Sequence, residues 1–303
     1  MHNNNILVQM ADNSSKPIAL VLSSGGARGV AQIGVIEELE SHGFTIKAIA
    51  GSSMGALIGG LYAAGKLGVY KDWVCKMTRM DVFNLVDFTF SRQGFIRGDR
   101  VFNEMKKLIK DCNIEDLDIP FTAVASNLKT HREIIFSTGS LYTALRASMA
   151  VPTIITPSYE TGDELVDGGI LNPVPMDLVK RTDGDQLVVV NVNAMEAYHK
   201  PHMKKIGRDQ SSKVYRNKLE ELKGRWLSIL PNQQTPPKKL SFFDLMNKSY
   251  DLMQDKLASI MIESYKPDLV INISNQSAGT FEYYKAKELI EVGREACRKT
   301  LSK

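Results

Sequence analysis

The residue in this sequence best suited to do chemistry is Ser53, which lies in the pattern Gly51-x-Ser53-x-Gly55. A serine that attacks a carbonyl must stand clear of the fold. A tight strand-to-helix turn achieves this, but it needs flanking glycines because the backbones approach closely. The pattern falls between a buried apolar strand at 46–50 and an apolar helix, as this mechanism requires. We therefore predict that Ser53 is a nucleophile on a sharp turn.

A second motif is the Gly-rich stretch Ser24–Gly29, which follows an apolar strand at 17–22. Consecutive glycines before a helix leave backbone N–H groups that suit a phosphate or an oxyanion. The dinucleotide pattern is not met, because Ser24 replaces its first glycine and Gly51 ends the next strand instead of an acidic residue. An oxyanion hole pairs naturally with a serine nucleophile on that strand.

The base that would activate the serine has two candidate sources. One is a histidine, although none of the five has an obvious triad setting; they are His2, His42, His131, His199 and His202. The other is the motif Asp167-Gly168-Gly169. An aspartate with a pKa near 3.9 is a weak base in water, but it can take a serine proton when it is in direct hydrogen-bond reach and partly desolvated. The residues alone leave both sources open.

The elements around these motifs predict an α/β fold. Strand–turn–helix occurs twice within residues 17–65, which is typical of a parallel sheet. Further apolar runs predict strands at 121–125, 133–136, 186–192 and 268–273. Periodic apolar residues predict helices at 99–109, 140–147, 242–262 and 281–299.

Composition excludes several classes of protein. The chain has 303 residues, of which 43% are hydrophobic and 24% charged, an ordinary globular mixture. The net charge of +4 does not favour a nucleic-acid partner. The three cysteines, Cys75, Cys112 and Cys297, are too far apart to suggest a zinc site or a disulfide framework. With no signal peptide and no long apolar run, we expect a cytoplasmic protein without a membrane span.

The charge is unevenly distributed. Residues 200–240 hold eleven Lys and Arg against three Asp and Glu, a net charge of +8 that leaves −4 for the rest of the chain. One interpretation is an exposed loop or lid, and the other is a strip that docks on an anionic membrane at its inner face. Aromatic and Met side chains could line a tunnel for an apolar substrate or belong to the core; they are Phe83, Phe88, Phe90, Phe95, Phe242, Phe243, Met246 and Met253.

Four motifs in order resemble the patatin-like phospholipase family, most closely its compact bacterial members. They are Ser24–Gly29, Gly51–Gly55, Ala147–Pro152 and Asp167–Gly169, and the resemblance covers roughly residues 17–195. It implies a three-layer α/β/α fold with a mostly parallel central sheet. We expect a flexible tail at 1–15, a single hydrolase domain at 16–303 and a basic insertion or lid at about 196–240.

The resemblance implies a serine hydrolase that cleaves lipid acyl esters through an acyl-enzyme, with no metal or organic cofactor. Ser53 would be the nucleophile and Asp167, in its motif with Gly168 and Gly169, the base. The oxyanion hole would be formed at residues Gly25, Gly26, Ala27 and Arg28.

The chain departs from the family pattern at Ser24, at Val151 where alanine is common, and at Gln32 where relatives often carry histidine. Arg28 could hold the glycine loop or meet a phosphate head group. Three alternatives to the dyad hydrolase remain: an acyltransferase, a Ser-His-Asp esterase, and a non-catalytic lipid-binding regulator on the same fold.

Overall fold

The computed structural model describes residues 16–85, 99–108, 110–152, 155–159, 162–201 and 242–302. The predicted tail at 1–15 and residues 202–241 of the basic segment lie outside the described residues. The strands and helices are β1 (Lys16–Leu22), α1 (Ala31–Ser41), β2 (Phe44–Ser52), α2 (Met54–Ala63), α3 (Leu67–Val74), α4 (Arg79–Leu85), α5 (Asp99–Leu108), β3 (Phe121–Asn127), β4 (Arg132–Phe136), α6 (Leu141–Ser148), β5 (Leu165–Asp167), β6 (Gln186–Ala194), α8 (Phe242–Tyr265), β7 (Leu269–Ser274) and α9 (Ala286–Leu301).

The strands form a seven-stranded sheet in the order β4-β3-β2-β1-β6-β7, with β5 paired to β3 beside this path. The four neighbouring pairs from β3 to β7 are parallel, whereas β4 and β5 run antiparallel to β3. The carboxyl ends of β1 and β2 therefore meet at one edge of the sheet. The Gly-rich stretch and Ser53 both begin at this edge, where parallel sheets place their ligands.

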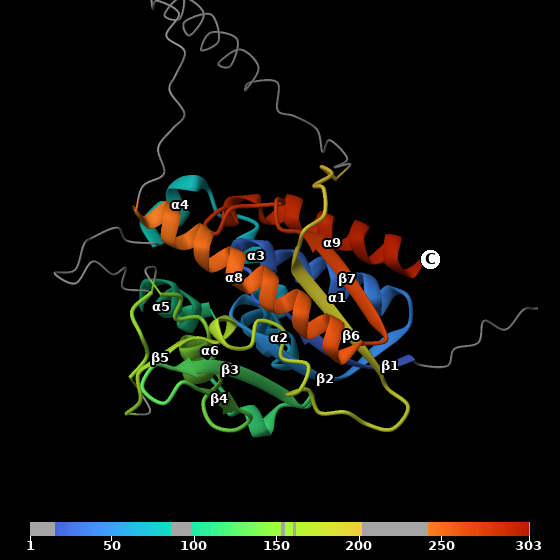
Figure 1. Cartoon of the computed structure of the whole chain (residues 1–303), viewed down its shortest axis with the longest axis horizontal. Coiled ribbons are helices and arrows are strands. Elements are labelled where there is room, and N and C mark those ends of the chain that lie inside the picture. Colours follow the sequence, from blue (N-terminus) through green and yellow to red (C-terminus); the bar gives the residue numbers. More distant parts are fainter. Residues whose placement is uncertain are drawn as a thin grey trace, which may run out of the picture.

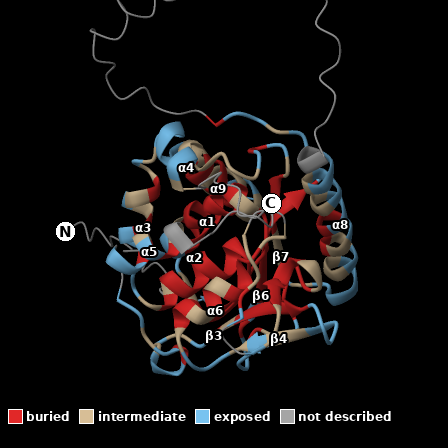
Figure 2. Cartoon of the chain, turned by 90° about the vertical axis from the view of Figure 1, so that its left-hand side faces the viewer, coloured by how far each residue is buried: buried red, intermediate tan, exposed pale blue. Residues whose placement is uncertain are grey.

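Helices cover both faces of the sheet, so the molecule has three layers (Figure 1). Alternation along β1 explains why: Ile18, Leu20 and Leu22 pack with α1, α2 and α9 on one face, and Ala19 and Val21 pack under α8 on the other. Figure 2 shows the buried residues along the strands and the exposed ones along the outside of α8. The three-layer α/β/α fold expected from the sequence is confirmed.

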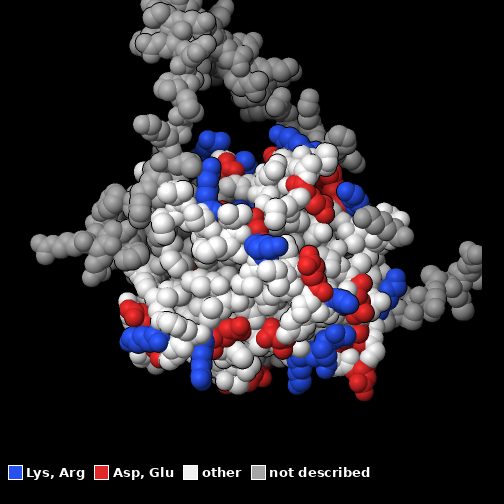
Figure 3. All heavy atoms as spheres, viewed as in Figure 1, with Lys and Arg blue, Asp and Glu red and all other residues white. Residues whose placement is uncertain are grey.

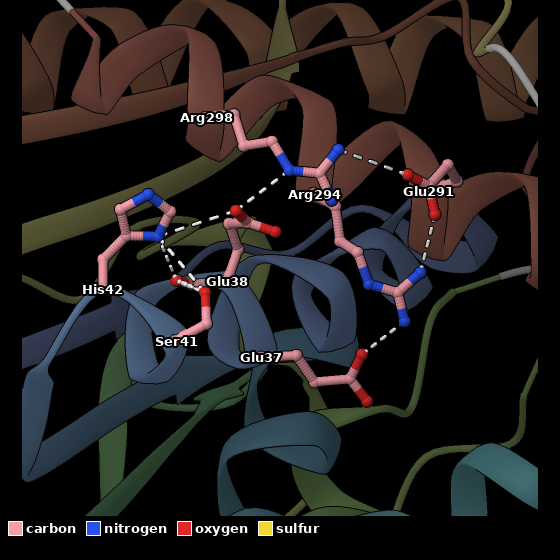
Figure 4. Close-up of polar contacts among 7 residues, drawn as sticks. All are labelled: Glu37, Glu38, Ser41, His42, Glu291, Arg294 and Arg298. Carbon is pink, nitrogen blue, oxygen red and sulfur yellow. Dashed lines mark hydrogen bonds and ion pairs between the residues drawn. The ribbon is translucent and has the colours of Figure 1, made fainter.

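Charged contacts join α1 to the C-terminal helix α9 (Figure 4). The Arg294 Nη2 atom donates to Glu37 Oε2 at 2.6 Å, and Arg298 Nε donates to Glu38 Oε1 at 2.9 Å. His42 lies beside the same cluster, with Nδ1 3.5 Å from Glu38 Oε1. These contacts fix the end of the chain against its first helix.

The sequence did not predict α3, α4 or the short strand β5, because none has a long apolar period. No helix among the described residues is both long enough and apolar enough to cross a membrane.

Candidate active site

Ser53 stands on a strained turn between β2 and α2. Its backbone has φ 54° and ψ −121°, a conformation that non-glycine residues rarely adopt. The turn brings backbones together: a Cβ on Gly55 would lie 2.1 Å from the carbonyl oxygen of Leu22. The amide of Ser53 donates to Ser148 Oγ at 2.9 Å, which ties the turn to the end of α6. The predicted turn and its requirement for glycine thus have a direct steric cause.

Strand β3 brings Asp167 to this serine. β2 ends on β3 with Ser52 opposite Val124, and β5 then pairs with the same strand, with Asp167 opposite Ala125. Strand β4 occupies one edge of β3. Strands β2 and β5 therefore both pair with the opposite edge of β3, one after the other along its length. The two candidate residues, 114 positions apart, meet where these strands adjoin.

The two side chains form a short hydrogen bond. Ser53 Oγ donates to Asp167 Oδ2 at 2.5 Å, and Asp167 is completely buried. Burial raises the pKa of Asp167 from 3.8 to about 6, although hydrogen bonds from Ser53, Gly169 and Tyr250 oppose this change. The carboxyl group is therefore a stronger base than an exposed aspartate, yet it is ionised at neutral pH.

Two residues of α8 complete the surroundings of the carboxylate, and neither was assigned a role from the sequence. The Tyr250 hydroxyl donates to Asp167 Oδ1 at 3.2 Å, and Gln254 Nε2 donates to the Tyr250 oxygen at 2.7 Å. The amide of Gly169 donates to the same Oδ1 at 2.7 Å. One carboxylate oxygen is thus held by two donors, and the other faces Ser53. Burial and the charge of Asp167 raise the pKa of Tyr250 well above 10, so its phenol keeps the proton that it donates.

A signal for these α8 residues exists in the sequence. Asn247, Tyr250, Asp251, Gln254 and Asp255 recur at spacings of three and four, so they share one face of the helix. A polar helical face is ordinarily interpreted as the solvent side. Only the fold reveals that this face points inward.

The Gly-rich loop faces the serine from the end of β1. The amides of Gly25 and Gly26 donate to no partner among the described residues. The Ala27 amide, by contrast, donates to the Thr280 carbonyl at 3.1 Å. The free amides of the loop are thus those of its two consecutive glycines.

Arg28 holds this loop in place and lines neither cavity beside Ser53. Its side chain is buried, and Nη2 contacts Asn193 Oδ1 at 3.1 Å and Asp251 Oδ1 at 3.3 Å. Of the two roles considered for Arg28, these contacts support holding the loop. The departure at Gln32 is also structural, because its Nε2 donates to the Ser23 carbonyl at 2.7 Å.

Ser24, the departure within the Gly-rich motif, lies beside the Asp167 motif. Its side chain is buried, and it lines neither of the two cavities. Its Cβ would lie 2.9 Å from a Cβ built on Gly169. Ser24 therefore packs against the Asp167 motif and does not narrow the loop in front of Ser53.

Ser53 lines two adjoining cavities that differ in the residues around them. The first, about 100 Å³, is walled by α2, α3, α4, α5 and apolar side chains such as Leu57, Tyr70, Trp73, Phe102, Met105 and Met149. The second, about 20 Å³, is lined by Gly25, Gly26, Asp167, Tyr250 and Gln254 among others. Both reach Ser53, so an ester carbonyl at the serine would have an apolar chamber on one side and polar groups on the other.

The acyl-tunnel candidates from the sequence are corrected by this chamber. Phe83, Met246 and Met253 are exposed side chains that neither line it nor belong to the core. Phe88, Phe90 and Phe95 lie outside the described residues, as do the side chains of Phe242 and Phe243. The chamber is built instead from other apolar residues of α2, α3, α4 and α5, which sequence analysis did not assign to a tunnel.

The described histidines lie away from the serine. His42 joins the α1–α9 cluster, His131 stands in the β3–β4 turn and His199 is exposed beyond β6. None of the three lines either cavity. His2 and His202 lie outside the described residues.

Comparisons with known proteins agree with this geometry. A family model described as patatin-like phospholipase matches residues 20–180. An uncharacterized NTE family protein from Mycobacterium tuberculosis is 31% identical over 97% of this chain and 94% of its own length.

Two further matches are partial. Lysophospholipase NTE1 from Cryptococcus neoformans is 32% identical over 59% of this chain but only 11% of its own length. The crystal structure of VipD from Legionella pneumophila aligns with 95% of this chain and 67% of that one, at a TM-score of 0.44 and 14% identity.

Proposed function

This chain belongs to the patatin-like phospholipase family of lipid acyl hydrolases, and we propose that Ser53 is its nucleophile and Asp167 the base. The observation that carries the proposal is the 2.5 Å hydrogen bond between Ser53 Oγ and the buried Asp167 Oδ2. In the first step Asp167 accepts the serine proton as Oγ bonds to the ester carbonyl carbon. The alcohol then leaves with that proton, and the acyl group stays on Ser53.

The amides of Gly25 and Gly26 are our candidates for the oxyanion hole. Both line the polar cavity beside Ser53, and both lack a described acceptor. The Ala27 amide is committed to Thr280, so in this proposal Ala27 shapes the loop and Arg28 anchors it. A donor that faces the developing negative charge typically contributes about 10²–10³ in rate.

The polar cavity also suits the second step, in which water releases the acyl group. Its volume of about 20 Å³ exceeds the roughly 10–15 Å³ that one water needs. A water held there would lie beside Asp167, which would take its proton as the oxygen attacks the acyl-enzyme. The products are a free fatty acid and the regenerated Ser53 hydroxyl.

Lysophospholipids are the substrate class that we propose for this site. The apolar chamber would accept an acyl chain, and the polar cavity beside it would leave the ester's hydrophilic side near Tyr250 and Gln254. The names of the fungal relatives point to the same class. A panel of lysophosphatidylcholine, phosphatidylcholine and a triglyceride should give the highest kcat/KM for the first; preference for the triglyceride would contradict this assignment.

The test of the nucleophile uses Ser53→Ala with Ser52→Ala as its matched control. Ser52 is also buried, but its hydroxyl has no hydrogen-bond partner among the described residues. Ser53→Ala should lose about 10⁴ or more in kcat and should no longer react with a fluorophosphonate probe. Ser52→Ala should keep both.

The competing mechanisms give different results in the same assays. A histidine-dependent triad would leave Asp167→Asn active while a histidine variant loses activity. An acyltransferase would pass the acyl group to an added alcohol faster than to water. A non-catalytic regulator would fail to label with the probe at all.

A further inference from the structure

Over residues 245–256, helix α8 is inverted, with apolar side chains outside and polar ones inside. Four consecutive residues show this pattern. Leu252 and Met253 are each 64% exposed, whereas Gln254 and Asp255 are 5% and 6% exposed. Soluble proteins normally bury such residues the other way round. The inversion therefore requires an explanation on each face.

The inward face is explained by the active site. Tyr250 bonds to Asp167, Gln254 to Tyr250, and Asp251 to Arg28. Asp255 accepts from Asn275 Nδ2 at 2.8 Å. The inward polar residues of α8 are thus held by contacts at or beside the site, and Leu252 and Met253 lie on the opposite face.

The outward face of α8 carries five exposed apolar side chains, and we call this face the α8 surface. It comprises the exposed large side chains Leu245, Met246, Leu252, Met253 and Ile260. At about 1.5 Å per residue they span roughly 24 Å along the helix. Figure 3 shows this side of the molecule largely uncharged, with isolated Lys or Arg side chains over the helix. Exposed large apolar side chains that gather on one face of a helix indicate an interaction site.

We propose that the α8 surface binds a lipid bilayer containing anionic lipid, with α8 lying flat in the interface. This inference rests on the proposed function, because a lipid acyl hydrolase finds its substrate at such a surface. The proposal explains why the exposed apolar side chains lie on α8, because the helix that would meet the bilayer also contacts Asp167 and lines the polar cavity beside Ser53. A lipid that leaves the bilayer at α8 would therefore be separated from the cavity beside Ser53 by this one helix.

Charge favours a bilayer over a second copy of the chain. Between Leu245 and Ile260 the exposed charged residues of α8 are Lys248 and Lys256. Lysine stems lie along apolar surface while their ammonium groups reach the head groups, as in helices that bind membrane interfaces. A two-fold contact through the same patch would bring like charges together. The Lys- and Arg-rich residues 200–240 immediately precede α8 in the sequence, which adds attraction to anionic lipid.

The test is flotation of the full chain with vesicles of phosphatidylcholine and phosphatidylglycerol. The variant Leu252→Gln/Met253→Gln should bind about a hundredfold more weakly, because each apolar side chain contributes at least about tenfold when buried. The matched control is Leu128→Gln/Met195→Gln, an exposed Leu and Met outside α8, which should bind like wild type. Replacing Lys248 and Lys256 by Gln should reduce binding roughly tenfold on these vesicles and little on pure phosphatidylcholine.

Two outcomes would overturn the proposal: equal vesicle binding by the α8 variant and wild type, or equal loss in the α8 variant and its control. Light scattering that finds a wild-type dimer and a monomeric α8 variant, with vesicle binding kept, would assign the surface to a second copy instead. Hydrolysis of a soluble butyryl ester reports the active site separately. A wild type that binds vesicles through α8 but cleaves no ester would refute the dyad and leave the surface standing.

Discussion

Replacing Asp167 by Asn should remove activity and stabilise the protein. Asn has the same shape, and its amide can donate to Ser53 Oγ while its oxygen accepts from Gly169 and Tyr250, the partners that Asp167 has now. It cannot take a proton from the serine, so ester hydrolysis should fall by about 10⁴. It also carries no charge into a completely buried position.

The size of the stabilisation follows from the pKa. Burial raises the pKa of Asp167 from 3.8 to about 6, and at ~1.4 kcal/mol per pH unit this corresponds to about 3 kcal/mol. The folded state binds the Asp167 proton more tightly than the unfolded state does. The stability that comes from this tighter binding is fully present below about pH 4. It is lost as pH rises through about 6. Asp167→Asn should therefore exceed wild type by about 3 kcal/mol near pH 8 and match it near pH 4.

Urea unfolding of both proteins across this pH range measures the difference. Asp185→Asn is the control of opposite sign: Asp185 is also buried, but hydrogen bonds from Thr182 and Arg181 outweigh burial and lower its pKa. Its stabilising effect is present above its ordinary pKa and lost in acid, so Asp185→Asn should destabilise the protein near neutral pH and less in acid. A constant difference between Asp167→Asn and wild type at every pH would refute the reasoning.

Three other substitutions test parts of the site. Tyr250→Phe removes a hydrogen bond that lowers the pKa of Asp167, so the midpoint of the kcat/KM–pH profile should move to higher pH with its plateau largely kept; an unmoved midpoint would deny Tyr250 this role. Val101→Trp, at the wall of the apolar chamber, should reduce hydrolysis of a palmitoyl ester more than that of a butyryl ester, and equal losses would place the chain elsewhere. Gly169→Ala should lose at least about tenfold in kcat, because its Cβ would lie 2.1 Å from Gln254 Nε2 and 2.9 Å from Asp167 Oδ1; Gly68→Ala, with nothing within 4 Å, is the control that should stay active.

The sequence predicted the parts of the site that depend on local backbone. The turn at Ser53 and the Asp167 motif each need glycines for steric reasons, and these glycines lie close to the functional residue in the sequence. The strands were also predicted from local sequence, since buried parallel strands are continuous apolar runs.

The interactions that the sequence missed join distant segments. Nothing near Tyr250 in the chain indicates that it meets Asp167, and nothing near Ala27 indicates that its amide is taken by Thr280. The polar face of α8 was misinterpreted for another reason: its spacing is visible in the sequence but is that of a solvent-facing helix, and only tertiary contacts turn it inward.

The contact between Ala27 and Thr280 has a consequence for synthesis of the chain. Once β6 has emerged from the ribosome, both Ser53 and Asp167 are already present. Thr280, which holds the glycine loop, and Tyr250, which holds the aspartate, are still to be made. A nascent chain therefore carries the reactive pair without its supports, and competence to attack lipid should arrive with the last quarter of translation, as the product is about to be released.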